Sequence, residues 1–203
     1  MPGGWVRHTA AVRLFAAVPV PEQVRDAVTV RLADVRDESR LRWVRPEHLH
    51  VTLAFYGDVP DGRVDALAAR LARAAGRVAP LRLRLGGPGT FGRPQAARVL
   101  WLTIDGDVEA LRRLAASARA CGRRVGLSGD ALRPEHRYRA HLTLARADPP
   151  ADVRALLDRL QPAEPASWTA EQAHLVRSDL GRGPGGSAAH TVIAALALRS
   201  DAR

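Results

Sequence analysis

One short phrase occurs twice in this chain, 91 residues apart, and it limits the folds that the sequence can adopt. The first copy is His50-Val51-Thr52-Leu53-Ala54, and the second is His141-Leu142-Thr143-Leu144-Ala145. Each copy is preceded by an Arg-Pro-Glu-His tetrapeptide, at 45–48 and at 133–136. The duplication predicts two related halves that each contribute one motif strand, with a ligand groove between them.

Alternation within each copy predicts that its histidine and its threonine face the same way. Residues two apart in a strand project from one face of a sheet, so His50 accompanies Thr52 and His141 accompanies Thr143. Imidazole titrates near neutrality, so one ring can take a proton from an incoming oxygen while the other protonates a leaving oxygen on the far side of a phosphorus atom. The threonine hydroxyls can donate hydrogen bonds to the non-bridging oxygens, and this chemistry requires no metal.

Arg146 is a third candidate, because a guanidinium beside the second motif would bind an anion. Strict alternation places Arg146 on the face opposite His141 and Thr143, so it reaches the site only if the strand ends or bulges near Ala145. The first copy has Phe55 at the matching position, and any such role is therefore confined to one half.

Strand-like segments and segments with helical spacing are interleaved along the chain. Several strands follow one another directly, which favours an α+β fold with a mostly antiparallel sheet over a doubly wound parallel sheet. No segment resembles a linker, so residues 1–203 are expected to form a single domain of two pseudo-symmetric lobes, with outer helices and a central cleft. The predicted strands are 12–18, 49–56, 81–85, 98–104, 138–145, 171–177 and 190–198, and the predicted helices are 22–36, 62–76, 107–121 and 151–160.

Glycines mark several expected ends of these elements. Gly57-Asp58 is predicted to end the first motif strand, and Gly122 to close the third helix. The segment 87–92 fits G-x-G-x-x-G, but a dinucleotide site requires a helix directly after it, and here a proline and another strand follow. This segment is therefore predicted to be an ordinary Gly/Pro-rich loop.

The formal net charge of +10 comes from 31 arginines, since the sequence contains no lysine. Two explanations stay open: a polyanionic partner such as RNA, or nucleotide bias in an Ala-, Arg- and Gly-rich sequence. Aromatic residues make up 4% of the chain, which argues against an extended base-stacking surface. No apolar run is long enough to span a membrane, and Cys121 as the only cysteine rules out an internal disulfide and favours the reducing cytoplasm.

The remaining histidines are weaker candidates. His48 shares a face with His50 and is expected to be a solvated or supporting residue, while His136, His174 and His190 are scattered, without zinc-ligand spacing. Cys121 is expected to pack at a helix end and not to act as a nucleophile.

The segments 46–57 and 141–146 resemble the two signatures of the 2H phosphoesterases, and most closely those of the RNA 2′,3′-cyclic phosphodiesterases, also called 2′-5′ RNA ligases or LigT-like proteins. Weaker matches occur at 13–16, 41–44, 89–91 and 98–102. The resemblance implies a bilobal α+β fold with both histidines in a central cleft, and hydrolysis of a 2′,3′-cyclic phosphate to a 2′-phosphomonoester. The chain departs from the family pattern at His48, Ala140 and His190, where Asn, Pro and Tyr are usual, which affects fine substrate preference.

By position, the resemblance makes His50 the general acid for the departing 3′ oxygen and His141 the group that activates water. Thr52, Thr143 and Arg146 would hold the phosphate. The expected enzyme needs no metal and no cofactor, its partner is an RNA or nucleotide with a 2′,3′-cyclic phosphate end, and no membrane or obligate protein partner is expected. Three alternatives stay open: cleavage or joining of 2′-5′ linked oligonucleotides, a non-catalytic nucleotide-binding or RNA-binding module, and a general basic RNA-binding protein.

Overall fold

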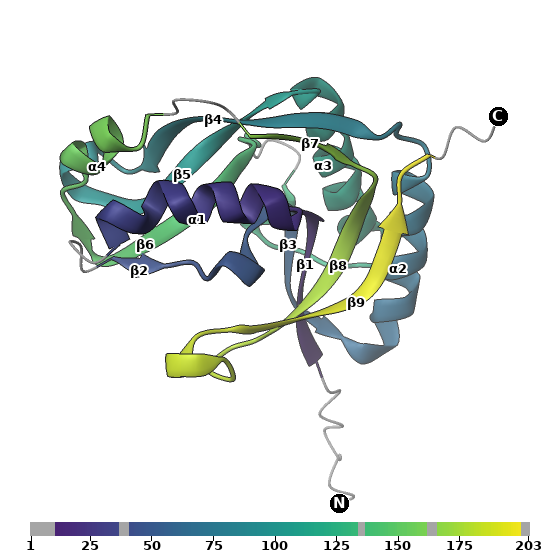
Figure 1. Cartoon of the computed structure of the whole chain (residues 1–203). Helices are drawn as coiled ribbons and strands as arrows, with labels where there is room; N and C mark the ends of the chain where they lie inside the picture. Colours follow the sequence, from purple (N-terminus) through teal and green to yellow (C-terminus); the bar gives the residue numbers. More distant parts are fainter. Residues whose placement is uncertain (1–10, 37–40, 134–136, 162–165, 200–203) are drawn as a thin grey trace, which may run out of the picture.

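A single, mostly antiparallel sheet organises the protein in the computed structural model, which describes residues 11–36, 41–133, 137–161 and 166–199 (Figure 1). Within these ranges the strand order is β7-β4-β5-β6-β3-β1-β8-β9, and the short strand β2 pairs with β6. This confirms the α+β class with antiparallel pairing. The strands are β1 (Ala11–Pro19), β2 (Arg42–Trp43), β3 (His50–Pro60), β4 (Leu81–Phe91), β5 (Ala97–Gly106), β6 (His141–Ala151), β7 (Ser167–Ala170), β8 (Gln172–Asp179) and β9 (Ala189–Ala197).

The sheet consists of two halves that meet at the motif strands. The halves run outward from the centre as β3-β1-β8-β9 and β6-β5-β4-β7, and β3 and β6 share one register pair, Val51 with Leu142. Along the chain, each motif strand comes after a strand and a helix: β1 and α1 precede β3, and β5 and α3 precede β6. The two copies of the phrase therefore lie side by side at the centre of the sheet, as the duplication predicts.

Four helices in the described residues cover the sheet: α1 (Glu22–Arg36), α2 (Asp61–Ala75), α3 (Val108–Arg124) and α4 (Arg154–Arg159). The helices α2 and α3 pack on the half that contains β3, with α2 against β8 and β9 and α3 against β3. The helix α1 lies beside α4, where Arg159 donates a hydrogen bond to the carbonyl of Asp34, and Figure 1 shows it crossing the other half. Buried valines and leucines repeat at helical spacing on α1 and α2, which explains why the sequence pattern located both helices.

The end of α3 was predicted wrongly, because Gly122 does not close the helix. It lies inside α3, where a Cβ atom would approach the ring of Tyr56 to 2.9 Å. The hydroxyl of Tyr56 donates a hydrogen bond of 3.1 Å to the carbonyl of Ala118 on the preceding turn. Gly122 is therefore needed where α3 crosses β3 closely, and Cys121 beside it is buried within the helix.

The predicted loop after residue 85 is also wrong, because β4 continues to Phe91. A register shift between Leu85 and Pro88 accommodates the extra residues, and pairing with β5 then resumes. A Cβ atom on Gly89 would lie 2.3 Å from the indole of Trp101, so this glycine allows β4 to pass over the ring. The first motif strand likewise runs past Gly57 to Pro60, while β2 and β7 are short strands that the sequence pattern did not indicate.

Candidate active site

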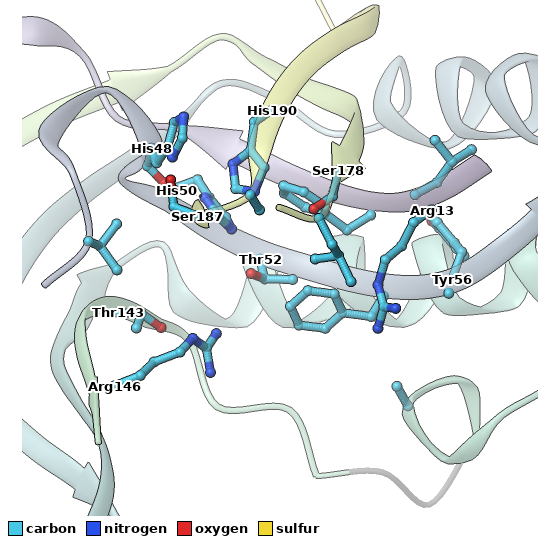
Figure 2. Close-up of a pocket in the computed structure, with 18 of the residues that line it drawn as sticks. Arg13, His48, His50, Thr52, Tyr56, Thr143, Arg146, Ser178, Ser187 and His190 are labelled. Carbon is cyan, nitrogen blue, oxygen red and sulfur yellow. Dashed lines mark hydrogen bonds between the residues drawn. The ribbon is translucent and has the colours of Figure 1, made fainter. Parts of the chain in front are cut away.

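A cavity of about 780 Å³ lies on one face of the junction between β3 and β6. Val51 and Leu142, the residues paired across the junction, are fully buried on the other face. Because neighbours in a strand point to opposite faces, the histidines and threonines of both motifs point into the cavity. His50, Thr52, His141 and Thr143 all line it, and Figure 2 shows His50, Thr52 and Thr143 directed toward its centre.

The two motif histidines are oriented by the same local hydrogen bond. Nδ1 of His50 lies 2.7 Å from the carbonyl of His48, and Nδ1 of His141 lies 2.8 Å from the carbonyl of Arg139, in each case two residues earlier. A carbonyl oxygen can only accept, so each Nδ1 carries the proton. Each Nε2 is then the nitrogen that is free to gain or lose a proton in the cavity.

Both motif strands bulge at the same position. On β3, Thr52 and Ala54 pair with consecutive residues of β1, which leaves Leu53 as the extra residue. On β6, Thr143 and Ala145 pair with consecutive residues of β5, which leaves Leu144 as the extra residue. An extra residue returns the following side chains to the face from which alternation had removed them.

These bulges determine which side chains line the cavity beside the histidines. Arg146 lines the cavity together with His141 and Thr143, which is the condition that its proposed role required. Its guanidinium points toward the space beside Thr143 in Figure 2. The equivalent residue of the first motif is Phe55, which also lines the cavity and is 49% exposed. The pseudo-symmetric site therefore has a cation on one side and an aromatic ring on the other.

Arg42 joins the site through the pairing of β2 with β6. It lies directly opposite Arg146 in the antiparallel register, and both line the cavity. Opposed residues of antiparallel strands share a face, and like charges in that position destabilise the pair. A bound anion would offset this repulsion, so the pair is suited to a negatively charged ligand. The sequence alone does not show which strand β2 joins, so it does not identify Arg42 as a residue of the site.

Burial and positive neighbours keep the first imidazole neutral. Burial, together with the nearby charges of His190, His48 and Arg146, lowers the pKa of His50 to about 4. The hydrogen bond to the carbonyl of His48 only partly opposes this shift. The ring also stacks on Phe15, with ring centroids 4.8 Å apart.

The second imidazole, that of His141, has a similar environment. Burial lowers the pKa of His141 as well, with smaller contributions from Arg146 and Arg139 against the hydrogen bond to the carbonyl of Arg139. The edge of Phe91 meets its ring at 4.9 Å, and Trp101 lies beside it at 6.0 Å. Each histidine thus has an apolar wall behind it and open space in front.

Two further histidines adjoin His50, and the sequence pattern placed only one of them near it. The rings of His48 and His190 stack with centroids 4.5 Å apart, and His190 meets His50 at 5.8 Å. A guanidinium nitrogen of Arg45 lies 3.1 Å from Nε2 of His48, and since guanidinium only donates, His48 accepts there in its neutral form. His190 lies on β9 and lines the cavity, because β8 and β9 complete this half of the sheet.

The other features noted in the sequence are not at this site. The described residues contain no cluster of three or more His, Cys, Asp or Glu side chains arranged for a metal ion. Burial raises the pKa of the Cys121 thiol, which disfavours a nucleophilic thiolate. No helix in the described ranges is both long and apolar enough to cross a membrane. His136 and most of the second Arg-Pro-Glu-His tetrapeptide lie outside the described residues.

A family model and curated proteins match most of the chain. The model of the 2′-5′ RNA ligase superfamily matches residues 20–182. An RNA 2′,3′-cyclic phosphodiesterase of Thermus thermophilus is 36% identical over 198 residues, which cover 94% of this chain and 92% of the relative. One of Methanothermobacter thermautotrophicus is 31% identical over 83% of this chain and 91% of the relative. A third, of Geobacillus stearothermophilus, is 32% identical, and the matched part spans about half (53%) of that protein.

Solved structures also superimpose on most of the chain. A crystal structure of a Thermus thermophilus protein superimposes with a TM-score of 0.74 and 31% identity, covering 93% of this chain and 99% of that one. The apo structure of E. coli LigT superimposes with a TM-score of 0.73 and 27% identity, covering 94% and 99%. LigT has also been crystallised in complex with 3′-AMP.

Proposed function

Because the chain belongs to the 2′-5′ RNA ligase superfamily, we propose that it is an RNA 2′,3′-cyclic phosphodiesterase that opens the cyclic phosphate at an RNA end to a 2′-phosphomonoester. One observation carries the proposal: two imidazoles, each with Nδ1 bound to a carbonyl and Nε2 free, enter one cavity from adjacent strands. Curated relatives that share 31–36% of their residues with the chain carry the name of this activity.

The proposed step is an in-line displacement at phosphorus. Nε2 of His141 removes a proton from water as the water oxygen attacks the phosphorus atom. The bond between phosphorus and the 3′ oxygen breaks, and Nε2 of His50 donates a proton to that oxygen. The product carries a free 3′ hydroxyl and a 2′-phosphate, and the two histidines have exchanged protonation states.

Protonation of His50 is linked to substrate binding in this mechanism. A pKa of about 4 leaves His50 neutral in the ligand-free protein near pH 7, so the acid must gain its proton when the substrate binds. The cyclic phosphate is an anion, and an anion beside an imidazole favours the protonated ring. The positive charge that disfavours protonation in the empty cavity is thus offset by the ligand.

Phosphate binding is assigned to the remaining polar groups of the junction. The hydroxyls of Thr52 and Thr143, which line the cavity from the two halves of the site, would donate to the two non-bridging oxygens. Arg146, returned to this face by the bulge at Leu144, supplies a charge-assisted hydrogen bond, and the opposed Arg42 adds a second positive charge. These groups form an anion site that needs no metal.

The alternative functions differ in what they require of the site. A binding module would not need two histidines with matched free nitrogens, so the geometry favours catalysis. Action on 2′-5′ linked oligonucleotides would use the same acid–base pair on another diester, and product analysis separates it from the proposed reaction. We also propose a cytoplasmic location, supported by the single cysteine in the sequence.

The decisive experiment is incubation with a nucleoside 2′,3′-cyclic phosphate in the presence of EDTA, followed by phosphorus NMR. We expect the 2′-monoester as the product, with a rate that EDTA does not change. A 3′-monoester would contradict the proposed bond cleavage, and loss of activity in EDTA would contradict the two-histidine mechanism. Binding without turnover would support the non-catalytic alternative.

A further inference from the structure

We propose that Arg13 forms a second phosphate subsite in the cavity, which binds the phosphodiester group on the 5′ side of the terminal nucleotide of an RNA substrate. The inference rests on the proposed function, because it concerns the same cavity and the same substrate end. It adds that the cavity recognises an RNA chain and not merely the terminal nucleoside with its cyclic phosphate.

Arg13 is too distant to share the phosphate of the histidine site. On β1, Ala17 pairs with Thr52 and Arg13 pairs with Asp58. Four residues of extended chain correspond to about 13 Å, which separates the backbone at Arg13 from the threonine at the centre of the site. Arg13 nevertheless lines the same cavity, and Figure 2 shows its side chain entering from the end away from His48.

The guanidinium of Arg13 has no counter-ion in the described part of the chain. Its side chain makes none of the ion pairs or hydrogen bonds found there, although Asp58 is its partner in the strand register. The acidic residue that lines the cavity, Asp130, is 3.1 Å from Arg133 and is thus already paired. An unpaired arginine in a cavity whose acidic lining residue is already paired is available to an external anion.

An aromatic side chain lies between the two proposed phosphate positions, because Phe55 pairs with Phe15 on β1, between the Thr52–Ala17 and Asp58–Arg13 pairs. Phe55 lines the cavity and is 49% exposed, and Leu180, which follows β8, lines it and is 64% exposed. Cavities that bind small ligands are lined mainly by apolar and aromatic side chains. The cavity therefore presents, in order, an anion site at Arg146, an apolar surface, and a cation at Arg13. This is the order of phosphate, nucleoside and phosphate along one strand of RNA.

The test compares three substrates with the same terminal base: the nucleoside 2′,3′-cyclic phosphate, its 5′-phosphorylated form, and a dinucleotide that ends in the cyclic phosphate. We expect wild-type protein to have a higher kcat/KM for the two substrates that carry a 5′-side phosphate. Arg13→Gln should reduce that preference roughly tenfold, the scale of one charge-assisted hydrogen bond, mainly through KM. Arg13→Lys should retain part of it, because a charge remains.

Arg177→Gln provides the matched control. Arg177 is on the neighbouring strand β8, paired in register with Leu14, but its guanidinium is bound to Asp179 at 2.9 Å and does not line the cavity. This variant should keep the wild-type preference. A preference that is unchanged in Arg13→Gln, or an equal loss on all three substrates, would overturn the proposal in favour of a structural role.

The three substrates also distinguish a phosphodiester from a terminal phosphate as the ligand of Arg13. They distinguish failure of the Arg13 subsite from failure of the proposed function. A preference for the 5′-monophosphate without one for the dinucleotide would overturn the assignment to an RNA phosphodiester. If the wild-type protein hydrolyses none of the three substrates, the proposed function fails. If it hydrolyses all three at equal efficiency, the function stands and the Arg13 subsite fails.

Discussion

Tyr138 in one half of the protein donates a hydrogen bond of 3.0 Å to the carbonyl of Thr52 in the other half. The bond lies directly behind the site, because Thr52 contributes its side chain to the cavity. Burial raises the pKa of the Tyr138 phenol, so the hydroxyl keeps its proton at physiological pH. With only one register pair between β3 and β6, this bond is an important link between the motif strands.

Replacement of Tyr138 by Phe should weaken that link without creating a large void. We expect the free energy of unfolding to fall by about 1–3 kcal/mol, because the carbonyl of Thr52 loses a buried partner. Urea denaturation measures this change, and kcat should fall along with stability because Thr52 is less well fixed. A Tyr138→Phe variant with wild-type stability would show that the strand contacts alone hold the halves together.

Removal of either imidazole that we propose to be catalytic should abolish most turnover. His50→Ala and His141→Ala are each expected to lower kcat by roughly 100-fold to 10,000-fold, the range for loss of a general acid or base. Because the two rings act in one step, the double variant should lose less than the product of the single effects. Thr52→Val should cost roughly tenfold, on the scale of a single hydrogen bond. A double variant that retains wild-type kcat would eliminate the two-histidine mechanism.

Substitution of Arg146 tests the consequence of the bulge at Leu144. Arg146→Ala should lower kcat/KM by roughly 10- to 100-fold, because a hydrogen bond to a charged group is lost in a partly dry site. Arg146→Lys keeps the charge but not the planar fork, and it should recover only part of the activity. If Arg146→Ala behaves like wild type, the guanidinium does not contact the reacting phosphate.

The pKa shifts predict an acidic optimum for the free enzyme. The active form has one neutral and one protonated histidine, and this form is most abundant between the two pKa values. Both lie below 6.5, with His50 at about 4, so kcat/KM should be maximal between about pH 4 and pH 6.5. Above this range both rings are neutral and the acid is lost, whereas below it both are protonated and the base is lost.

Bound substrate should move this profile. Because the phosphate anion raises the pKa of the imidazoles beside it, the profile of kcat should lie at higher pH than that of kcat/KM. Steady-state kinetics across about pH 4–8 on one cyclic nucleotide provide both profiles. A kcat/KM profile that is flat across this range would exclude histidine acid–base catalysis in the free enzyme.

His190 allows a specific test of the electrostatics around His50. Its positive charge lowers the pKa of His50, so His190→Phe should raise that pKa while keeping an aromatic ring in contact. The acidic limb of kcat/KM should therefore shift to higher pH. His174→Phe is the control, since His174 lies on β8 and does not line the cavity. An equal shift in both variants would show a general effect of charge on the protein.

Alternation located the histidine and threonine pairs from sequence because those residues depend only on the local period of a strand. Arg146 could not be placed in this way, since its direction is set by the extra residue Leu144, and a bulge is defined by pairing with β5. Arg42 and His190 reach the cavity through the pairings of β2 and β9, which are contacts between distant parts of the chain. The local pattern therefore yields the two motif histidines and threonines but only part of their surroundings.

The errors in the fold have a similar origin. Gly89 belongs to a Gly/Pro-rich segment typical of a loop, and Gly122 is a residue type typical of a helix end, yet both lie within regular elements. At each position a large aromatic ring occupies the space that a side chain would fill. Trp101 and Tyr56, the rings concerned, are distant in sequence from these glycines. Intrinsic preference is overridden at such positions by packing that a local pattern does not contain.

The strand order determines when the sheet can be completed during synthesis of the chain. β1 is completed by pairing with β8, and β8 pairs with β9, so one half of the sheet joins the earliest strand to the latest. Such distant pairings form late, because the intervening chain must first be restrained. A nascent chain on the ribosome that lacks residues beyond 170 has both histidine motifs but neither β8 nor β9. We therefore expect the protein to have no activity on RNA ends until its translation is nearly finished.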